Sequence, residues 1–84
     1  MHKLLIERPA ERDLKSLEPN VQTRIIQAIR ALAAEPRPRG CRKLAGSTAD
    51  WRIRVGDYRI VYEIDRAARA ITITRIRHRR EAYR

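Results

Sequence analysis

The spacing of the apolar residues changes along the chain from a helical to a strand-like pattern, and this change limits the possible folds most. Between Pro9 and Leu32, apolar residues recur at intervals of three and four, as they do on one face of a helix. From Trp51 onward they alternate with polar residues, as they do in a strand with one buried face. Residues 35–40 separate the two halves, because two prolines and a glycine cannot continue a helix.

The N-terminal half predicts one short strand followed by two helices. Residues 2–7 form the expected strand, which is apolar at its centre. Pro9 and Pro19 each suit the first turn of a helix, where the missing N–H of proline costs nothing. The two apolar stripes are Ala10, Leu14 and Leu17 in the first helix, and Val21, Ile25, Ala28, Ile29 and Leu32 in the second. Helices so close in sequence are expected to form an antiparallel hairpin.

The C-terminal half predicts a β-hairpin with strands at 51–55 and 58–64, in which apolar and polar residues alternate. Gly56 and Asp57 connect the strands and fit a type II′ turn, because glycine tolerates the positive φ that this turn needs at its first central position. Residues 41–50, which precede the hairpin, are expected to form a loop with at most one short strand.

A further strand is expected at 70–77, after a second turn. Ile71 and Ile73 are in phase with each other in this strand, whereas Ile76 is out of phase. The change of phase predicts a β-bulge near residues 74–75. One extra residue at that point would re-aim every side chain beyond it.

This order of strand, helical hairpin and three-stranded antiparallel meander predicts a two-layer α+β domain over residues 1–84. The helices must bury their apolar stripes against one face of the sheet, which is expected to be antiparallel. The other face is left free. The alternating pattern places Arg52, Arg54 and Arg59 on that free face, provided that the hairpin is in register.

The positive charge is concentrated in the C-terminal half. The chain carries a net charge of +10, and residues 36–84 hold fourteen Lys/Arg against five Asp/Glu, a difference of +9. Nearly all of the excess is arginine, which binds phosphates with two parallel hydrogen bonds and stacks on bases. A basic surface kept for solubility does not account for this uneven distribution, and anionic lipid is the less favoured alternative partner. Nucleic acid is therefore the favoured partner.

Several classes of site are disfavoured by the composition. Cys41 is the single cysteine, so no internal disulfide can form, and a reducing compartment is indicated. A metal site is not expected, because His2 and His78 are distant in sequence from Cys41. No apolar run reaches the roughly 20 residues of a membrane span. We therefore expect a cytoplasmic protein that needs no cofactor and no membrane.

The C-terminal segment 75–84 adds arginines, a histidine and a tyrosine, a combination that is compatible with RNA cleavage. Such cleavage needs a base for the 2′-hydroxyl, stabilisation of the phosphorane and a proton for the leaving oxygen. Arginines supply the second requirement, and His78 can exchange protons near neutral pH. Tyr83 can stack on a base or donate a proton. A disordered basic tail, a structural histidine and a simple RNA binder are the alternatives that the pattern leaves open.

Three segments together resemble the RelE/ParE toxin superfamily, and its RelE-like branch in particular. They are the hairpin at 51–64, the proline-bearing loop that leads to Lys43-Leu44-Ala45-Gly46, and the ending His78-Arg79-Arg80-Glu81-Ala82-Tyr83-Arg84. The resemblance implies the toxin of a type II toxin–antitoxin pair. Members of the RelE branch cleave mRNA in the ribosomal A site without a metal and leave a 2′,3′-cyclic phosphate.

The resemblance also implies a set of site residues and partners. By position it makes Arg59, Arg79 and Tyr83 catalytic and Arg52 and Arg54 substrate-binding. The basic tail and loop themselves add His78 as a catalytic candidate and Arg77 and Lys43 as substrate-binding candidates. Some relatives have lysine where this chain has Arg52 and Arg54, so the general base stays unassigned. The implied partners are a cognate antitoxin, the ribosome and mRNA, with operator DNA reached only through the antitoxin complex.

Two other functions are compatible with the same resemblance. The ParE branch shares the fold and inhibits DNA gyrase. A toxin fold that has lost its activity can also persist as a repressor subunit or an RNA binder. The arginine-rich strands and the His/Tyr ending favour the endonuclease over both.

Overall fold

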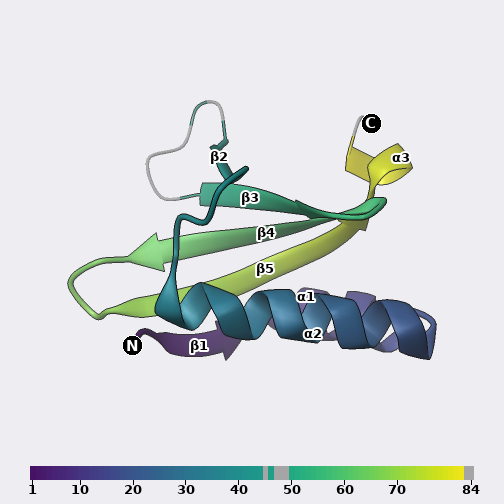
Figure 1. Ribbon diagram of the computed structural model, residues 1–84, viewed down its shortest axis with the longest axis horizontal. Coiled ribbons are helices and arrows are strands. Elements are labelled where there is room, and N and C mark those ends of the chain that lie inside the picture. The colour runs from purple at the N-terminus through teal and green to yellow at the C-terminus, as the bar shows by residue number, and fades with distance from the viewer. Residues whose placement is uncertain (45, 47–49, 83–84) are drawn as a thin grey trace.

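The computed structural model describes residues 1–44, 46 and 50–82, and within them the chain forms a sheet with the strand order β1-β5-β4-β3-β2 (Figure 1). The elements in chain order are β1 Lys3–Ile6, α1 Arg8–Lys15, α2 Pro19–Ala34, β2 Arg42–Lys43, β3 Asp50–Val55, β4 Tyr58–Asp65, β5 Ala70–His78 and α3 Arg79–Ala82. The long helix α2 runs along the β1–β5 side of the sheet in Figure 1, with α1 behind it. The predicted α+β class and element order are confirmed.

The helical hairpin forms as predicted. Pro9 lies in the first turn of α1, and Pro19 begins α2. The side chain of Gln22 in α2 donates hydrogen bonds to the carbonyl oxygens of Leu14 and Leu17, both at 3.0 Å. Carbonyl groups at the end of a helix lack partners within the helix, so Gln22 closes the end of α1 and ties the two helices together.

The sheet differs from the prediction in the direction of one strand. β1 pairs with β5 in parallel, with Lys3 opposite Ala70 and Ile6 opposite Ile73, so the sheet is mixed and not wholly antiparallel. The physical reason is the long connection: parallel neighbours need a crossover, and the two helices supply part of it. A short β2 also pairs with β3, which places Lys43 opposite Trp51.

The β-hairpin and the bulge agree with the sequence pattern. Gly56 has φ +59, whereas Asp57 does not have a positive φ, as a type II′ turn requires. Val61 pairs with Arg75 but Tyr62 pairs with Ile73, so Thr74 is the extra residue of β5. This bulge allows Ile71, Ile73 and Ile76 all to be buried.

The core lies between the helices and one face of the sheet. Its buried side chains are Ala10, Ile25, Leu32, Ile53, Ile60, Tyr62, Ile71, Ile73 and Ile76. Tyr62 is completely buried, and its hydroxyl donates a hydrogen bond of 2.7 Å to the carbonyl oxygen of Pro36. Burial, together with the neighbouring Cys41, raises the pKa of Tyr62 far above its usual value. The phenol therefore stays protonated and anchors the loop that follows α2.

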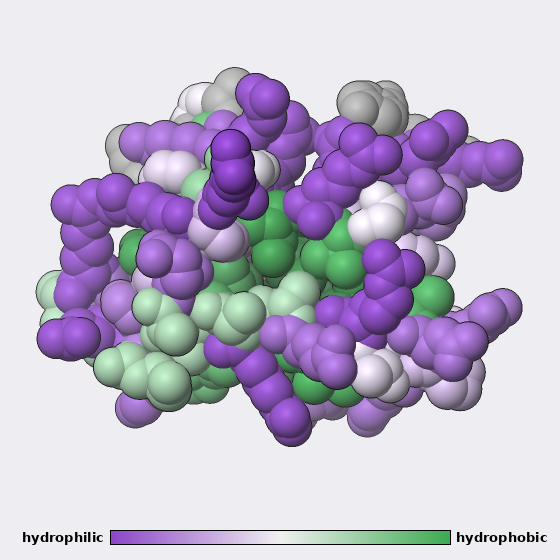
Figure 2. Space-filling view, in the orientation of Figure 1, coloured by the Kyte–Doolittle hydropathy of each residue, from purple (hydrophilic) through white to green (hydrophobic). Residues whose placement is uncertain are grey.

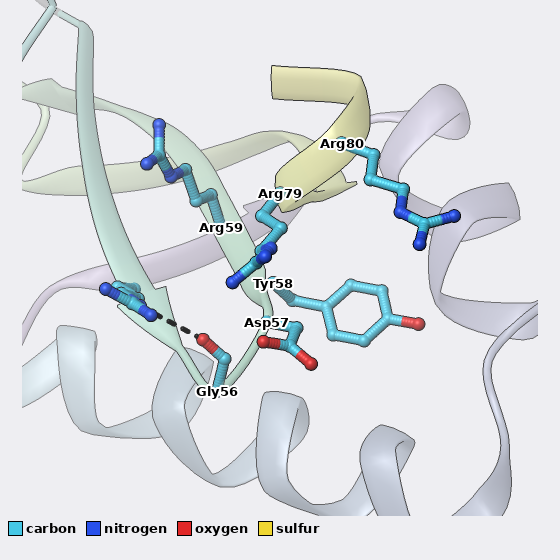
Figure 3. Close-up of a pocket in the computed structure, with 7 residues that line it drawn as sticks. Gly56, Asp57, Tyr58, Arg59, Arg79 and Arg80 are labelled. Carbon is cyan, nitrogen blue, oxygen red and sulfur yellow. Dashed lines mark hydrogen bonds between the residues drawn. The ribbon is translucent and has the colours of Figure 1, made fainter. Parts of the chain in front are cut away.

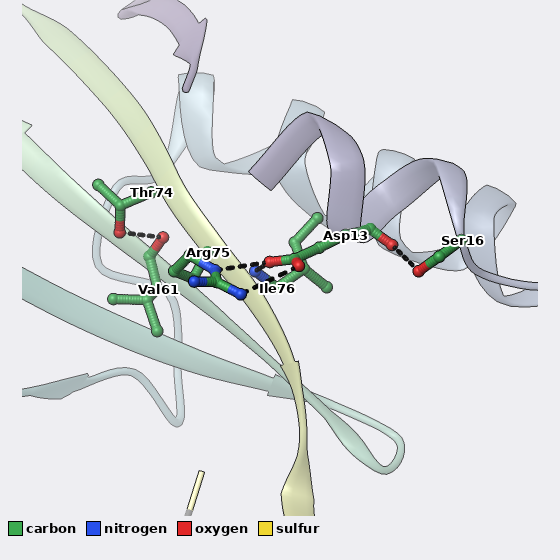
Figure 4. A network of polar contacts seen from close by, with 6 residues as sticks. All are labelled: Asp13, Ser16, Val61, Thr74, Arg75 and Ile76. Atoms are coloured by element: carbon green, nitrogen blue, oxygen red, sulfur yellow. Dashed lines mark hydrogen bonds and ion pairs between the residues drawn. The ribbon is translucent and has the colours of Figure 1, made fainter. Parts of the chain in front are cut away.

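Asp13 of α1 binds the edge of β5 beyond the residues that pair with β1 (Figure 4). Its carboxylate accepts a hydrogen bond from the backbone N–H of Ile76 at 2.9 Å and two from the guanidinium of Arg75, at 2.9 and 3.2 Å. Burial alone raises the pKa of Asp13, but these bonds and the charges of Arg75 and Arg77 outweigh it and leave the pKa lowered. The ionised carboxylate is therefore favoured in the folded chain.

We expect Asp13→Asn to lower the free energy of unfolding by about 1–3 kcal/mol at neutral pH, because the charge-assisted bonds to Arg75 are lost. The Arg75 side chain is 41% exposed, so solvent screening favours the lower half of this range. Folding lowers the pKa of Asp13, so its contribution to the free energy of unfolding is fully present at a pH above the ordinary pKa of 3.8. This contribution is lost as the pH falls through the folded-state pKa. Urea unfolding at several pH values should show the difference between wild type and variant shrinking in acid.

The matched control is Glu11→Gln on the same helix. Glu11 pairs with Lys15 at 3.4 Å, but their side chains are 51% and 75% exposed. An exposed pair of this kind contributes little, so the change should stay within about 0.5 kcal/mol. Equal losses in the two variants would contradict the role given to Asp13.

Candidate functional site

The strand register groups arginines on the sheet face opposite the core. Arg54 of β3 pairs with Arg59 of β4, and Arg59 pairs with Arg77 of β5. Arg52 pairs with Arg42 of β2 on its other side. The predicted grouping of Arg52, Arg54 and Arg59 on one face is therefore confirmed.

A cleft of about 430 Å³ opens beside the β3–β4 turn (Figure 3). Its lining residues are Arg54, Gly56, Asp57, Tyr58, Arg59, Arg79 and Arg80, and we call it the arginine cleft. Arg54 Nε donates a hydrogen bond of 3.2 Å to the Gly56 carbonyl oxygen, which orients its guanidinium. The backbone N–H of Arg79 donates one of 2.7 Å to the Asp57 carbonyl oxygen, so the start of α3 is held against the turn.

A second cleft of about 320 Å³ continues the same surface along β3. It shares Arg54 and Arg59 with the arginine cleft and adds Gly40, Arg42, Arg52 and Ile53. The two clefts thus form one surface on which six arginines lie: Arg42, Arg52, Arg54, Arg59, Arg79 and Arg80.

The electrostatics of this surface favour an anion. Arginine stays protonated at any physiological pH, so neighbouring guanidinium groups repel each other until an anion neutralises them. Among the described residues that line the two clefts, Asp57 is the one carboxylate. Guanidinium groups can bind phosphate oxygens in pairs and can stabilise the negative charge that develops on a reacting phosphorus centre.

His78 is not among the residues that line the arginine cleft, although its neighbour Tyr58 is. It pairs with Tyr58 in the sheet, and the two rings meet edge to face, with centroids 5.2 Å apart and planes at 88°. Its Nδ1 accepts a hydrogen bond of 3.2 Å from the backbone N–H of Arg80. These two contacts fit a structural role for His78, and its catalytic role stays a prediction.

The other predicted site residues do not lie together. Lys43 lines a separate cleft with Trp51. Arg77 lies across from Arg59, and its charge contributes to lowering the pKa of Asp13. Tyr83 lies outside the described residues.

Four residues that line the arginine cleft were not among the predicted site residues: Gly56, Asp57, Tyr58 and Arg80. Asp57 and Tyr58 had been assigned to the turn and to the alternating pattern of β4, respectively. The available signal was the position of Asp57 beside Gly56, because residues in a tight turn at the end of two arginine-bearing strands must lie near those arginines.

An apolar groove of about 220 Å³, which shares no lining residue with the two arginine-lined clefts, lies between β1 and the helices. It is lined by Leu4, Leu5, Ile6, Leu14, Ile26, Ile29, Arg30 and Ile73. Leu5 is 48% exposed and Ile6 is 40% exposed, although both belong to a strand of the sheet. Figure 2 shows hydrophobic residues in a different hollow, at the middle of the molecule between α2 and β3, with hydrophilic residues around it.

Two further searches of the described residues bear on the class of site. No group of three or more His, Cys, Asp or Glu side chains within them could hold a metal ion. No helix in the described part of the chain has the length and apolar character needed to cross a membrane.

The sequence matches a family model described as the ParE toxin of type II toxin–antitoxin systems, parDE, over residues 4–83. A comparison with curated proteins found no match. The chain belongs to this toxin family, within the RelE/ParE superfamily that the hairpin and the closing segment predicted.

Solved structures support the same assignment. The archaeal RelE–RelB complex from Pyrococcus horikoshii contains a chain that is 28% identical, with a TM-score of 0.83 and coverage of 93% of this chain and 94% of that one. The RelBE2 toxin–antitoxin complex from Mycobacterium tuberculosis contains one that is 26% identical, with a TM-score of 0.81 and coverage of 92% and 96%. The isolated RelE toxin of E. coli, at 18% identity, TM-score 0.81 and coverage of 99% and 96%, shares the fold.

We expect the double variant Arg54→Ala/Arg79→Ala to bind a short 2′-O-methyl oligoribonucleotide more weakly and with less dependence on salt. Each phosphate contact to a single strand adds about 0.7 to the slope of log K against log salt, so two lost contacts should reduce the slope by about 1.4. The control is Arg8→Ala/Arg12→Ala, which removes the same charge from exposed positions on α1. Equal slopes for the two variants would show that only net charge matters.

Proposed function

We propose that this toxin is a metal-independent endoribonuclease that cleaves mRNA on translating ribosomes in the cytoplasm and thereby inhibits translation. The observation that carries the proposal is the arginine cleft, which four arginines and one carboxylate line at the end of the β-hairpin. Such a site suits a phosphodiester, because it offers charge stabilisation and a proton acceptor together.

The proposed reaction is attack of a 2′-oxygen on the adjacent phosphorus. Asp57 accepts the proton of the 2′-hydroxyl, and Arg59 and Arg79 stabilise the phosphorane. Arg52 and Arg54 hold the flanking backbone. The bond from phosphorus to the 5′-oxygen then breaks, which leaves a 2′,3′-cyclic phosphate and a 5′-hydroxyl. Tyr83 donates the proton to the leaving oxygen, and His78 is the alternative donor.

Mapping of mRNA 5′ ends after expression of the toxin tests this proposal. We expect cuts in phase with codons on translated messages. Arg59→Ala should reduce their number by about 10²–10³, the size of effect seen when one group that stabilises a transition-state charge is removed. Asp57→Asn should also abolish most cutting while leaving RNA binding intact or stronger, because it removes a negative charge from the cleft.

The Asp57 variant separates catalysis from binding. Undiminished cutting by Asp57→Asn would exclude Asp57 as the base and leave the cleft as a binding site served by another base. Intact mRNA with the wild-type toxin would overturn the endonuclease proposal as a whole.

The family model supports a second candidate function, because it is described as a ParE toxin. In that case the toxin inhibits DNA gyrase and the arginine surface contacts a protein or DNA. DNA breaks that accumulate while mRNA ends stay unchanged would favour this function over the first.

We also propose a cognate antitoxin, which the toxin–antitoxin complexes among the similar structures support. An amphipathic segment of the antitoxin fits two features of this surface. Its apolar side would pack into the groove at Leu5 and Ile6, and its acidic side would bind the arginines of the cleft. Neutralisation of the arginines would close the site to phosphates. Contact with operator DNA is then made through the antitoxin.

Leu5→Asp should weaken the complex with the antitoxin by about tenfold or more, because an apolar contact is replaced by a charge that must be desolvated. Titration of the purified antitoxin measures the change. Ala67→Asp, at an exposed position in the β4–β5 turn, adds the same charge outside the groove and should have little effect. Unchanged affinity of Leu5→Asp would place the antitoxin on another surface.

A further inference from the structure

A second cationic surface lies at the other end of the molecule, and it contains the single tryptophan of the chain. A cleft of about 340 Å³ is lined by Arg37, Lys43, Trp51, Ile64 and Arg66, which we call the tryptophan patch. An adjoining cleft of about 270 Å³ shares Arg37, Ile64 and Arg66 and adds His2, Glu35 and Pro36. The two clefts thus combine three permanent cations with one carboxylate.

Arg37 contacts the Trp51 ring in the unliganded chain. Its guanidinium carbon lies 5.2 Å from the centroid of the Trp51 ring, within the range of a cation–π interaction. The neighbouring Pro36 is held by the hydroxyl of the buried Tyr62, at 2.7 Å. Trp51 and Tyr62 are paired across β3 and β4. Tyr62 therefore holds the loop at Pro36, while its partner Trp51 supplies the ring that Arg37 contacts. An ordered arginine loses less side-chain entropy when it binds an anion.

The tryptophan patch is separate from the arginine cleft. The two share no lining residue. Trp51 and Val55 lie four residues apart on β3, which corresponds to about 13 Å at 3.3 Å per residue. Figure 1 shows the beginning of β3 and the end of β4 at one end of the molecule, and α3 with the β3–β4 turn at the other.

We propose that the tryptophan patch is a second RNA-binding surface, at which Arg37, Lys43 and Arg66 contact backbone phosphates and the Arg37–Trp51 pair offers a stacking platform for a base. Arginine planes and aromatic rings are the groups on which unpaired RNA bases stack. A nucleic acid carries a charge on every nucleotide, so one strand can satisfy both cationic ends of the chain. An acidic peptide would need two separated clusters of carboxylates. The proposal concerns binding alone and extends beyond the cleavage proposed above.

Trp51 allows this surface to be observed directly, because it is the only tryptophan. The probe is a short 2′-O-methyl oligoribonucleotide, which lacks the free 2′-hydroxyl needed for cleavage. We expect it to change the tryptophan fluorescence in a saturable and salt-dependent way. The result does not depend on ribonuclease activity, so failure of the cleavage proposal would leave it unaffected.

The decisive variant is Arg37→Ala/Lys43→Ala/Arg66→Ala, in which all three substituted residues are exposed. Loss of three phosphate contacts should reduce the slope of log K against log salt by about 2. The matched control is Arg8→Ala/Arg12→Ala/Lys15→Ala, which removes two arginines and one lysine from exposed positions on α1. The control should keep a slope close to that of the wild type, and thermal unfolding of both variants checks that they remain folded.

Three results would overturn the proposal. One is an equal decrease in the slope of log K against log salt for the two triple variants, which would show that only the net charge of the protein matters. Another is RNA binding that leaves Trp51 fluorescence unchanged and is insensitive to the patch variant. The third is a fluorescence change produced by polyglutamate but not by the oligoribonucleotide, which would assign the surface to an acidic protein.

Discussion

The register of β4 against β5 is the constraint on which the rest of the structure depends. Thr74 is an extra residue in β5, and its hydroxyl donates a hydrogen bond of 3.1 Å to the Val61 carbonyl oxygen. A shift of one residue moves every later side chain of a strand to the other face of the sheet. The extra residue therefore lets apolar residues on both sides of the bulge point into the same core. It buries Ile76 after Ile73 and sets Arg77 opposite Arg59.

The same region explains how the helices hold the site in place. β1 ends at Ile6, so the remainder of the β5 edge would expose backbone groups if α1 did not reach it. Asp13 fills this gap by binding both the Ile76 N–H and Arg75. Beyond that point β5 continues to the start of α3, where the Arg79 N–H is bound by the β3–β4 turn. The arginine cleft is thus supported by a chain of backbone and side-chain bonds that begins on α1.

Charge and apolar surface are divided over the molecule. Cations gather in the arginine cleft and in the tryptophan patch, whereas the exposed leucine and isoleucine of β1 border the apolar groove. Repulsion between like charges and exposed apolar area both disfavour the isolated chain, and a small domain has little core with which to offset them. A partner that neutralises or covers these surfaces therefore stabilises the fold by mass action. This coupling suits a protein whose relatives are found in complexes with antitoxins.

The sequence by itself determined the elements that depend on local spacing: the helical hairpin, the Gly56 turn, the bulge at Thr74 and the shared face of Arg52, Arg54 and Arg59. The helices, the bulge and the shared face follow from periods of 3.6 or 2 that neighbouring residues reveal, and the turn follows from the tolerance of glycine for a positive φ. The tertiary structure alone decided which distant segments meet. It made β1 parallel to β5, turned His78 toward Tyr58, brought Asp57 among the arginines and moved Lys43 to the tryptophan patch. Periodicity assigns a side chain to a face, but the pairing of strands and the packing of loops decide its neighbours, because those depend on contacts between residues far apart in the chain.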